Sequence, residues 1–186
     1  MSNPTRRNDP PAPILVPVDF EPAARSALIT GARLAMSTGA PLNILHVVHE
    51  PADRPNYYQR RSAGDVVLPI DELAGRMLQD FLLDIYRLNP ELENLKNPDT
   101  LLVHGLPCTR IPEVASRLGA SQVVIGQHRS KGIFGNLFAL PSERIANRCD
   151  VPVTIVYSDA TPLHAGHPPQ LPPPLAVDGS HVAAMR

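Results

Sequence analysis

The chain has 186 residues, of which 43% are hydrophobic, 19% are charged and 22 are proline, and its formal net charge is −1. This near-neutral balance gives no electrostatic basis for binding nucleic acid or an anionic membrane surface. The apolar runs are short, and none approaches the roughly 20 residues of a membrane-spanning helix. The N-terminal segment lacks the apolar stretch of a secretory signal. We therefore expect a cytoplasmic protein that binds neither nucleic acid nor membrane.

The prolines divide the chain into three parts. Four lie in residues 1–13, six lie in 159–174, and twelve lie between. Both ends also lack a helix or strand pattern, so we predict disordered tails at 1–12 and 159–186 around one domain at 13–158. The proline-rich C-terminal tail favours polyproline II structure. It is either a solvated tail or a ligand for a partner protein.

The first half of the predicted domain alternates between strand and helix patterns. An apolar run at 14–19 predicts a buried strand, and the helix formers at 21–37 predict the helix that follows it. A second apolar run at 42–48 predicts the next strand. Residues 49–69 are polar and irregular, and 70–88 is strongly amphipathic, which predicts a second helix.

The second half repeats this alternation. Strands are predicted at 100–104, at 122–126 and at 153–157, from runs of apolar and β-branched residues. A helix at 107–118 begins with proline and is followed by glycine, as helix ends often are. A further helix is predicted at 142–148.

Strands that are apolar throughout and separated by helices are typical of a parallel sheet covered on both faces. We therefore predict a doubly wound, Rossmann-like α/β fold with five parallel strands. Ligands of such folds bind beyond the carboxyl ends of the strands. This rule selects Asp19, Val47, His104 and the segment after Gly126 as candidate site residues.

Asp19 follows an otherwise apolar strand and directly precedes a helix. Its carboxylate could accept hydrogen bonds from a ligand, such as a ribose or an adenine amine. It could equally cap the helix that begins near Pro22. The residue alone does not decide between these two interpretations.

The segment after Gly126 combines glycines with cations, since Arg129, Lys131, Gly132 and Gly135 follow within it. Backbone N–H groups of such a loop could cradle phosphates ahead of a helix. The glycine spacing matches neither a dinucleotide-binding fingerprint nor a Walker loop. A flexible connection between strand and helix is the alternative interpretation.

Five short segments together resemble the universal stress protein family. They are Ile-Leu-Val-Pro-Val-Asp-Phe from 14, Leu-His-Val-Val from 45, His-Gly from 104, Ala-Ser-Gln-Val-Val-Ile-Gly from 120 and Val-Pro-Val-Thr-Ile-Val from 151. They occur in the family's order between about Ile14 and Tyr157. The resemblance implies the five-stranded α/β fold predicted above. It also implies a homodimer that pairs the last strands, here from Val153 to Tyr157.

In the nucleotide-binding branch of that family, adenosine lies between the first two strands. The resemblance places this part of the site at Pro17, Asp19 and Val47. Val18, which lies between Pro17 and Asp19 in the sequence, is included with them. We therefore expect Asp19 to hold the polar edge of a nucleoside and Val47 to pack on the base. ATP, ADP and AMP are the candidate ligands.

The family's triphosphate motif is altered in this chain. That motif is a glycine, two residues, a second glycine, nine residues and then Gly-Ser or Gly-Thr. Gly126 fits the first position, but Arg129, Ala139 and Leu140 occupy the other three. Each lost phosphate contact could cost about 1–3 kcal/mol. Cations can replace such contacts, and Ser142 lies two residues beyond the expected hydroxyl.

The candidate phosphate side of the site therefore consists of Gly126, His128, Arg129, Lys131 and Gly132. Arg129 or Lys131 would neutralise phosphate charge. Together with the strand-end residues, these complete a candidate site for an adenine nucleotide or a related small ligand. The alternative is a dimeric interaction or regulatory module whose vestigial cleft does not bind ATP.

We predict no enzyme, because the sequence contains no nucleophile elbow or other recognisable catalytic arrangement. Slow ATP hydrolysis is known in the family. Cys108 and Cys149 form no CxxC motif, and we expect them to be reduced, buried thiols. Cys108 begins a helix, where a thiol can become reactive, but a structural role is the simpler interpretation.

We also predict no metal site. His46, His104 and His128 all fall near strand ends, where three imidazoles could converge on zinc, but they lack a metal-ligand spacing. The segment 49–69 contains the aromatic and basic cluster Tyr-Tyr-Gln-Arg-Arg, which begins at Tyr57. This segment is either a solvated loop or a lid over the cleft.

Overall fold

A computed structural model describes residues 11–49, 58, 69–128 and 141–158. The predicted strands and helices are confirmed, with ends that differ by at most two residues from the prediction. The predicted tails lie almost wholly outside the described residues, so the domain limits remain a prediction. The elements are β1 (Ile14–Val18), α1 (Pro22–Thr38), β2 (Leu42–Val48), α3 (Ile70–Leu88), the 3-10 helix η1 (Glu93–Leu95), β3 (Asp99–His104), α4 (Pro107–Leu118), β4 (Gln122–His128), α5 (Pro141–Ala146) and β5 (Val153–Ser158).

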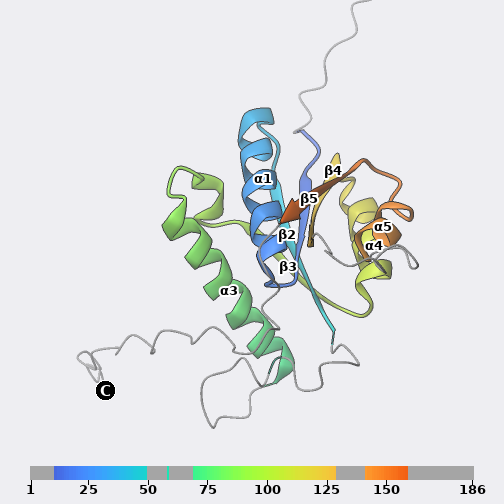
Figure 1. Ribbon diagram of the computed structural model, residues 1–186, viewed down its shortest axis with the longest axis horizontal. Helices are drawn as coiled ribbons and strands as arrows, with labels where there is room; N and C mark the ends of the chain where they lie inside the picture. Colours follow the sequence, from blue (N-terminus) through green and yellow to red (C-terminus); the bar gives the residue numbers. More distant parts are fainter. Residues whose placement is uncertain (1–10, 50–57, 59–68, 129–140, 159–186) are drawn as a thin grey trace, which may run out of the picture.

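The strands form one parallel five-stranded sheet in the order β3-β2-β1-β4-β5 (Figure 1). This order confirms the doubly wound α/β fold. The chain first builds outward from β1 to β3 and then returns to the other side of β1. We had expected every strand to be apolar throughout, and β3 departs from this expectation. It lies at an edge of the sheet and is largely exposed, so polar residues are tolerated there. β1, by contrast, is central and buried along its whole length.

Helices α1 and α3 cover one face of the sheet, and α4 and α5 cover the other (Figure 1). Each face has its own apolar cluster. The first contains Val16, Val18, Ile44, Leu28 and Ile85 among others. The second is smaller and contains the residues Leu15, Leu45, Val47, Ile111, Ala115, Ala120, Val123, Ile125 and Ile145.

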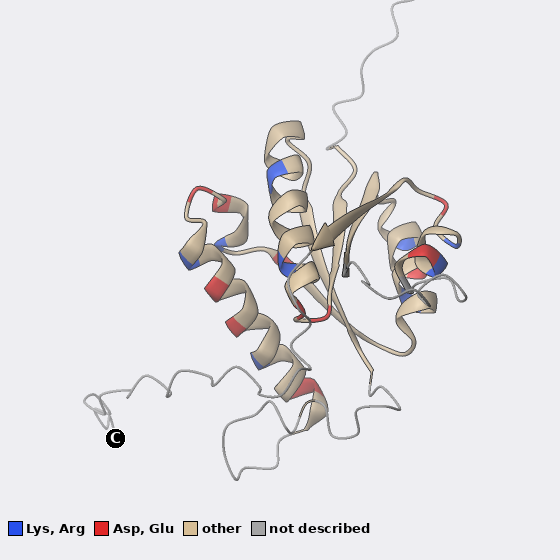
Figure 2. Cartoon of the chain, viewed as in Figure 1, with Lys and Arg blue, Asp and Glu red and all other residues tan. Residues whose placement is uncertain are grey.

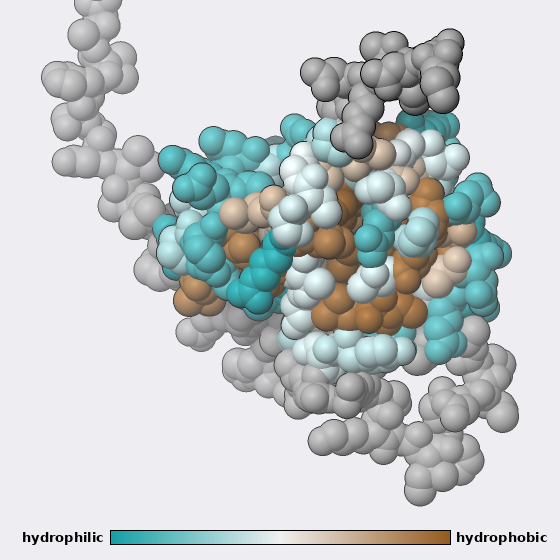
Figure 3. Space-filling view, turned by 90° about the horizontal axis from the view of Figure 1, so that it is seen from above, coloured by the Kyte–Doolittle hydropathy of each residue, from teal (hydrophilic) through white to brown (hydrophobic). Residues whose placement is uncertain are grey.

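Charged residues lie mainly on the outer sides of the helices and in the connections (Figure 2). Seen from above, apolar surface gathers near the centre of the molecule and hydrophilic residues lie around it (Figure 3). No helix in the described ranges is long and apolar enough to cross a membrane. Cys108 and Cys149 are both half-buried free thiols rather than fully buried ones, because they pack at the margin of the α4 and α5 cluster.

Candidate functional site

A pocket of about 190 Å³ lies at the carboxyl ends of β1, β2 and β4. It unites five of the predicted site residues, namely Pro17, Val18, Asp19, Val47 and Gly126. His128 ends β4, and the position of its side chain is not described. Arg129, Lys131 and Gly132 lie outside the described residues, so the phosphate side of the site remains a prediction. The lining also includes Ala24, Leu45, His46, Pro107, Ile111, Ile125, Ser142 and Ile145.

The pocket forms where two central strands separate. β1 pairs with β2 along its whole length, as far as Val18 opposite His46. Its ladder with β4 covers only Ile14 and Leu15. Pro17 has no N–H group to extend a ladder. The connections from the two strands that flank this gap lead to opposite sides of the sheet, from β1 to β2 and from β4 to β5. Such a switch point is where α/β folds bind ligands.

The deep walls of the pocket are apolar. Leu45 and Val47 come from β2, and Ile125 comes from β4. Ile111 of α4 and Ile145 of α5 close the opposite side. All five belong to the cluster under α4 and α5. Such walls suit a flat, weakly polar group such as a heterocyclic base.

Asp19 is exposed in the turn between β1 and α1. Its Oδ1 atom accepts a hydrogen bond from the backbone N–H of Glu21 at 3.1 Å. Glu21 occupies the N-cap position of α1, and its own side chain makes no capping hydrogen bond. Asp19 therefore stabilises the turn before the helix rather than acting as the N-cap residue. Asp19 lines the pocket from this position.

Gly126 allows the first turn of α1 to lie directly on β4. A Cβ atom at this position would come within 2.2 Å of the carbonyl oxygen of Ala23 and within 2.7 Å of the Ala24 nitrogen. No side chain can be accommodated against rigid backbone at that distance. Packing alone therefore requires glycine here, so this residue is not specific to phosphate binding.

Ser142 and Gln127 form a buried polar pair beside the pocket. The Ser142 hydroxyl donates a hydrogen bond to Oε1 of Gln127, and both side chains are buried. Ser142 lies in α5 and lines the pocket. The sequence had marked Ser142 only as a displaced hydroxyl of the phosphate motif. Gln127 was not singled out, although it directly follows Gly126.

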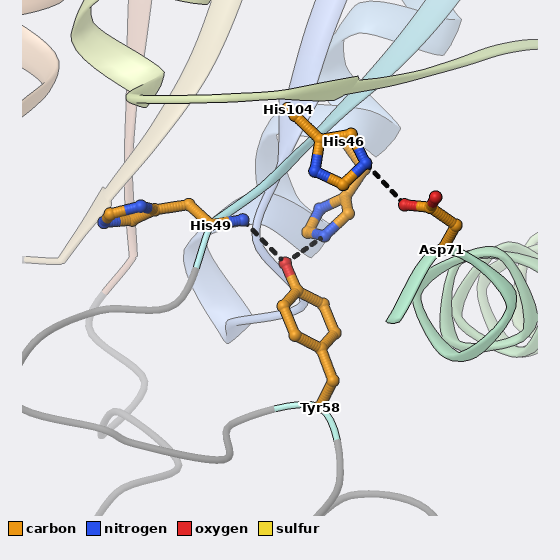
Figure 4. Close-up of polar contacts among 5 residues, drawn as sticks. All are labelled: His46, His49, Tyr58, Asp71 and His104. Atoms are coloured by element: carbon orange, nitrogen blue, oxygen red, sulfur yellow. Dashed lines mark hydrogen bonds and ion pairs between the residues drawn. The ribbon is translucent and has the colours of Figure 1, made fainter. Parts of the chain in front are cut away.

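His46 is buried and fully engaged with protein groups. Its Nδ1 lies 2.8 Å from the Val18 carbonyl oxygen. Its Nε2 lies 3.0 Å from the Tyr58 hydroxyl (Figure 4). Burial lowers the pKa of His46 to about 4, although the hydrogen bond to Val18 partly opposes this shift. His46 is therefore neutral at physiological pH.

Of the three histidines considered for zinc, His46 and His104 have described side chains, and these bind different partners. His104 is exposed and pairs with Asp71 at the start of α3, with 2.5 Å between Nε2 and Oδ1 (Figure 4). His46 instead binds Val18 and Tyr58. Within the described part of the chain, no group of three or more His, Cys, Asp or Glu side chains is arranged to hold a metal ion.

Tyr58 was not predicted as a site residue. It lies in the irregular segment 49–69, yet its side chain is only 1% exposed. Its hydroxyl oxygen also accepts the backbone N–H of His49 at 3.1 Å. An aromatic residue with a polar tip, close in sequence to a strand that carries a buried histidine, is the signal that could have identified it.

Solved structures of similar fold belong to universal stress proteins. The chain superimposes with TM-score 0.51 on universal stress protein UspA from Lactobacillus plantarum, at 19% identity over 80% of this chain and 99% of that one. For a universal stress protein from Archaeoglobus fulgidus the TM-score is 0.51, at 18% identity over 77% of this chain and 97% of that one. For a universal stress protein solved in complex with cAMP the TM-score is 0.52, at 20% identity over 77% of this chain and 95% of that one.

No sequence among the curated proteins matches the chain. The family model of the universal stress protein family, in contrast, matches residues 12–157. This range spans all the strands and helices described above except Ser158, the last residue of β5. The chain therefore belongs to the universal stress protein family.

Proposed function

We propose that this chain is a cytoplasmic stress-response protein that binds an adenine nucleotide or a related small ligand in the strand-end pocket. It acts by binding, without an essential catalytic step. The observation that supports this function most is the convergence of Pro17, Asp19, Val47 and Gly126 on one pocket. These residues come from the ends of three strands, β1, β2 and β4, and the family resemblance had assigned each of them to the nucleotide.

The chemistry of the pocket suits the nucleoside part of such a ligand. Val47 and Ile125 offer apolar surface to a base, and the exposed Asp19 carboxylate can accept hydrogen bonds from ribose hydroxyls or an exocyclic amine. The volume of about 190 Å³ is below the roughly 300–1,000 Å³ of pockets that hold whole ligands. The rest of the ligand would therefore extend beyond the strand ends.

The similar universal stress protein solved with cAMP supports a nucleotide with one phosphate. The altered triphosphate motif points the same way, since Arg129, Ala139 and Leu140 replace three of its positions. We therefore expect AMP to bind at least as tightly as ATP.

Isothermal titration with ATP, ADP and AMP tests this function. Asp19→Ala should weaken AMP binding at least about tenfold, because it removes hydrogen bonds to a charged acceptor. The matched control is Asp84→Ala, which removes an exposed carboxylate from α3, a helix that contributes no residue to the pocket lining. It should leave the affinity unchanged. Absence of heat with every nucleotide up to millimolar concentration would refute ligand binding.

Such a result would favour the second candidate, a dimeric interaction module. β5 lies at an edge of the sheet, where its described ladder partner is β4 on one side. Tyr157 is 50% exposed there. A second copy could pair with this edge, and the proline-rich tail could contact a partner protein. Analytical sedimentation of the Tyr157→Asp variant tests the dimer, and this variant should be monomeric. The control is Leu88→Asp, which changes an exposed apolar residue on α3 and should leave the dimer intact.

A further inference from the structure

A continuous chain of hydrogen bonds links the β2–α3 connection to the turn that carries Asp19. Two links join His49 N to Tyr58 Oη at 3.1 Å and Tyr58 Oη to His46 Nε2 at 3.0 Å (Figure 4). The third joins His46 Nδ1 to the Val18 carbonyl oxygen at 2.8 Å. Tyr58 and His46 are buried. Tyr58, one residue of this connection, is thus linked through His46 to Val18, which lines the pocket.

The direction of each hydrogen bond follows from the chemistry of its groups. The Val18 carbonyl can only accept, so Nδ1 of His46 carries the ring proton. The neutral ring then has a bare Nε2, which accepts the Tyr58 O–H. The Tyr58 oxygen accepts the His49 N–H in turn. All donors point the same way along the chain, an arrangement in which neighbouring hydrogen bonds strengthen one another.

His46 contacts the residues on both sides of Asp19. It binds the Val18 carbonyl, and its ring centroid lies 4.3 Å from that of Phe20. Phe20 has a φ angle of +65°, a left-handed conformation that is unfavourable for a bulky residue. Neighbouring contacts must therefore enforce the turn, and His46 supplies two of them.

We propose that Tyr58 is a positioning residue of the ligand pocket. It orients His46, which holds the Val18–Phe20 turn in the conformation that presents Asp19 to the ligand. The proposal rests on the ligand binding proposed above. It gives the connection between β2 and α3 a role in binding without contact between Tyr58 and the ligand.

The first test uses ligand-free protein and the Tyr58→Phe variant, which removes one hydroxyl group. The Glu21 amide donates to Asp19, so its hydrogen exchange reports on the turn. We expect exchange at Glu21 to become at least about fivefold faster, with no change at the Asn89 amide at the end of α3. Tyr86→Phe, on α3, is the matched control and should alter neither. Unchanged exchange at Glu21, or equal acceleration at both amides, would overturn the proposal.

The second test is a double-mutant cycle on AMP affinity. Tyr58→Phe should weaken binding about five- to tenfold in the wild-type background and have no further effect in Asp19→Ala. Equal weakening in both backgrounds would show that Tyr58 acts elsewhere and overturn the proposal. If the wild-type protein binds no nucleotide, the proposed function fails, whereas exchange at Glu21 still decides whether Tyr58 positions the turn.

Discussion

The two faces of the sheet are covered by helices of different length. Helices α1 and α3 have 17 and 19 residues and lie over the larger apolar cluster. Helices α4 and α5 have 12 and 6 residues and lie over the smaller one. Five of the apolar residues that line the pocket belong to this second cluster, namely Leu45, Val47, Ile111, Ile125 and Ile145, whereas Val18 and Ala24 belong to the first. The difference shows how one sheet provides both a filled, supporting face and a face with room for a ligand.

The supporting face nevertheless contributes to the site. The first turn of α1 lies against Gly126, and the His46 ring holds the end of β1 from the same side. A ligand under α4 and α5 would thus contact the turn that carries Asp19, and His46 holds this turn from the opposite face of the sheet. Away from the hydrogen bonds of Tyr58 and His46 that hold this turn, changes in the packing of the first face should act mainly on stability, whereas changes on the second face should act mainly on binding.

Gly126→Ala should have the largest effect on stability. The new Cβ would overlap the backbone of Ala23, so α1 must move away from β4, and we expect a loss of about 4 kcal/mol in the free energy of unfolding. Gly75→Ala is the control, because its Cβ would meet only Leu102 at 3.9 Å; within a helix it should stabilise by about 0.5–1 kcal/mol. Urea unfolding measures both. Equal stability of the two variants would contradict the close contact of α1 with β4.

Acidification should weaken the fold through His46. The folded state keeps this ring neutral down to about pH 4, whereas the unfolded chain takes up a proton below its ordinary pKa of 6.5. Stability should therefore fall between pH 6.5 and 4, by about 3 kcal/mol from this residue. Urea unfolding of wild type and His46→Gln across this range gives the difference. A parallel pH dependence in the two proteins would show that His46 is not buried as a neutral ring.

Ser142→Ala should destabilise the protein by about 2 kcal/mol, because it leaves the buried Gln127 oxygen without this donor. Ser116→Ala, on the surface of α4, is the matched control. Since Ser142 also lines the pocket, AMP affinity should change in the first variant only. Thermal melts and titrations measure the two effects. A Ser142→Ala protein as stable as the control would argue against the polar pair.

Two isoleucine substitutions compare the faces most directly and should have the smallest effects. Ile85→Val removes a methylene from the α1 and α3 face, and Ile111→Val removes one from the pocket wall. We expect losses of about 1 kcal/mol and about 0.5 kcal/mol, because the second site already adjoins a cavity. Only Ile111→Val should change AMP affinity. A change in affinity with Ile85→Val would remove the distinction between the faces.

Most of the fold could be predicted from local sequence, because most strands are short apolar runs separated by helix patterns. The strand-end rule also located the pocket, since Asp19 follows β1, and Val47 and Gly126 lie close to the carboxyl ends of β2 and β4. The role of Asp19 as a cap could not be decided from sequence. It depends on which backbone N–H the carboxylate reaches, and the turn directs it to Glu21.

Contacts between distant side chains could not be predicted in the same way. The bond between His46 and Tyr58 depends on the path of a connection that has no periodic pattern. The pair of Ser142 and Gln127 depends on where α5 docks on β4. In both cases one member belongs to a strand that sequence reasoning had identified, and the partner comes from an irregular or short element. Arg129, Lys131 and Gly132 remain predicted phosphate contacts.

The central claim is that an adenine nucleotide binds between the ends of β1, β2 and β4. Titration of isotope-labelled protein with AMP, followed by NMR at each backbone amide, tests it most directly. The account predicts saturable shifts at Asp19, Val47, Gly126 and Ser142 and none at Asp84 on the outer side of α3. Shifts confined to residues outside the pocket, or none at millimolar AMP, would contradict it.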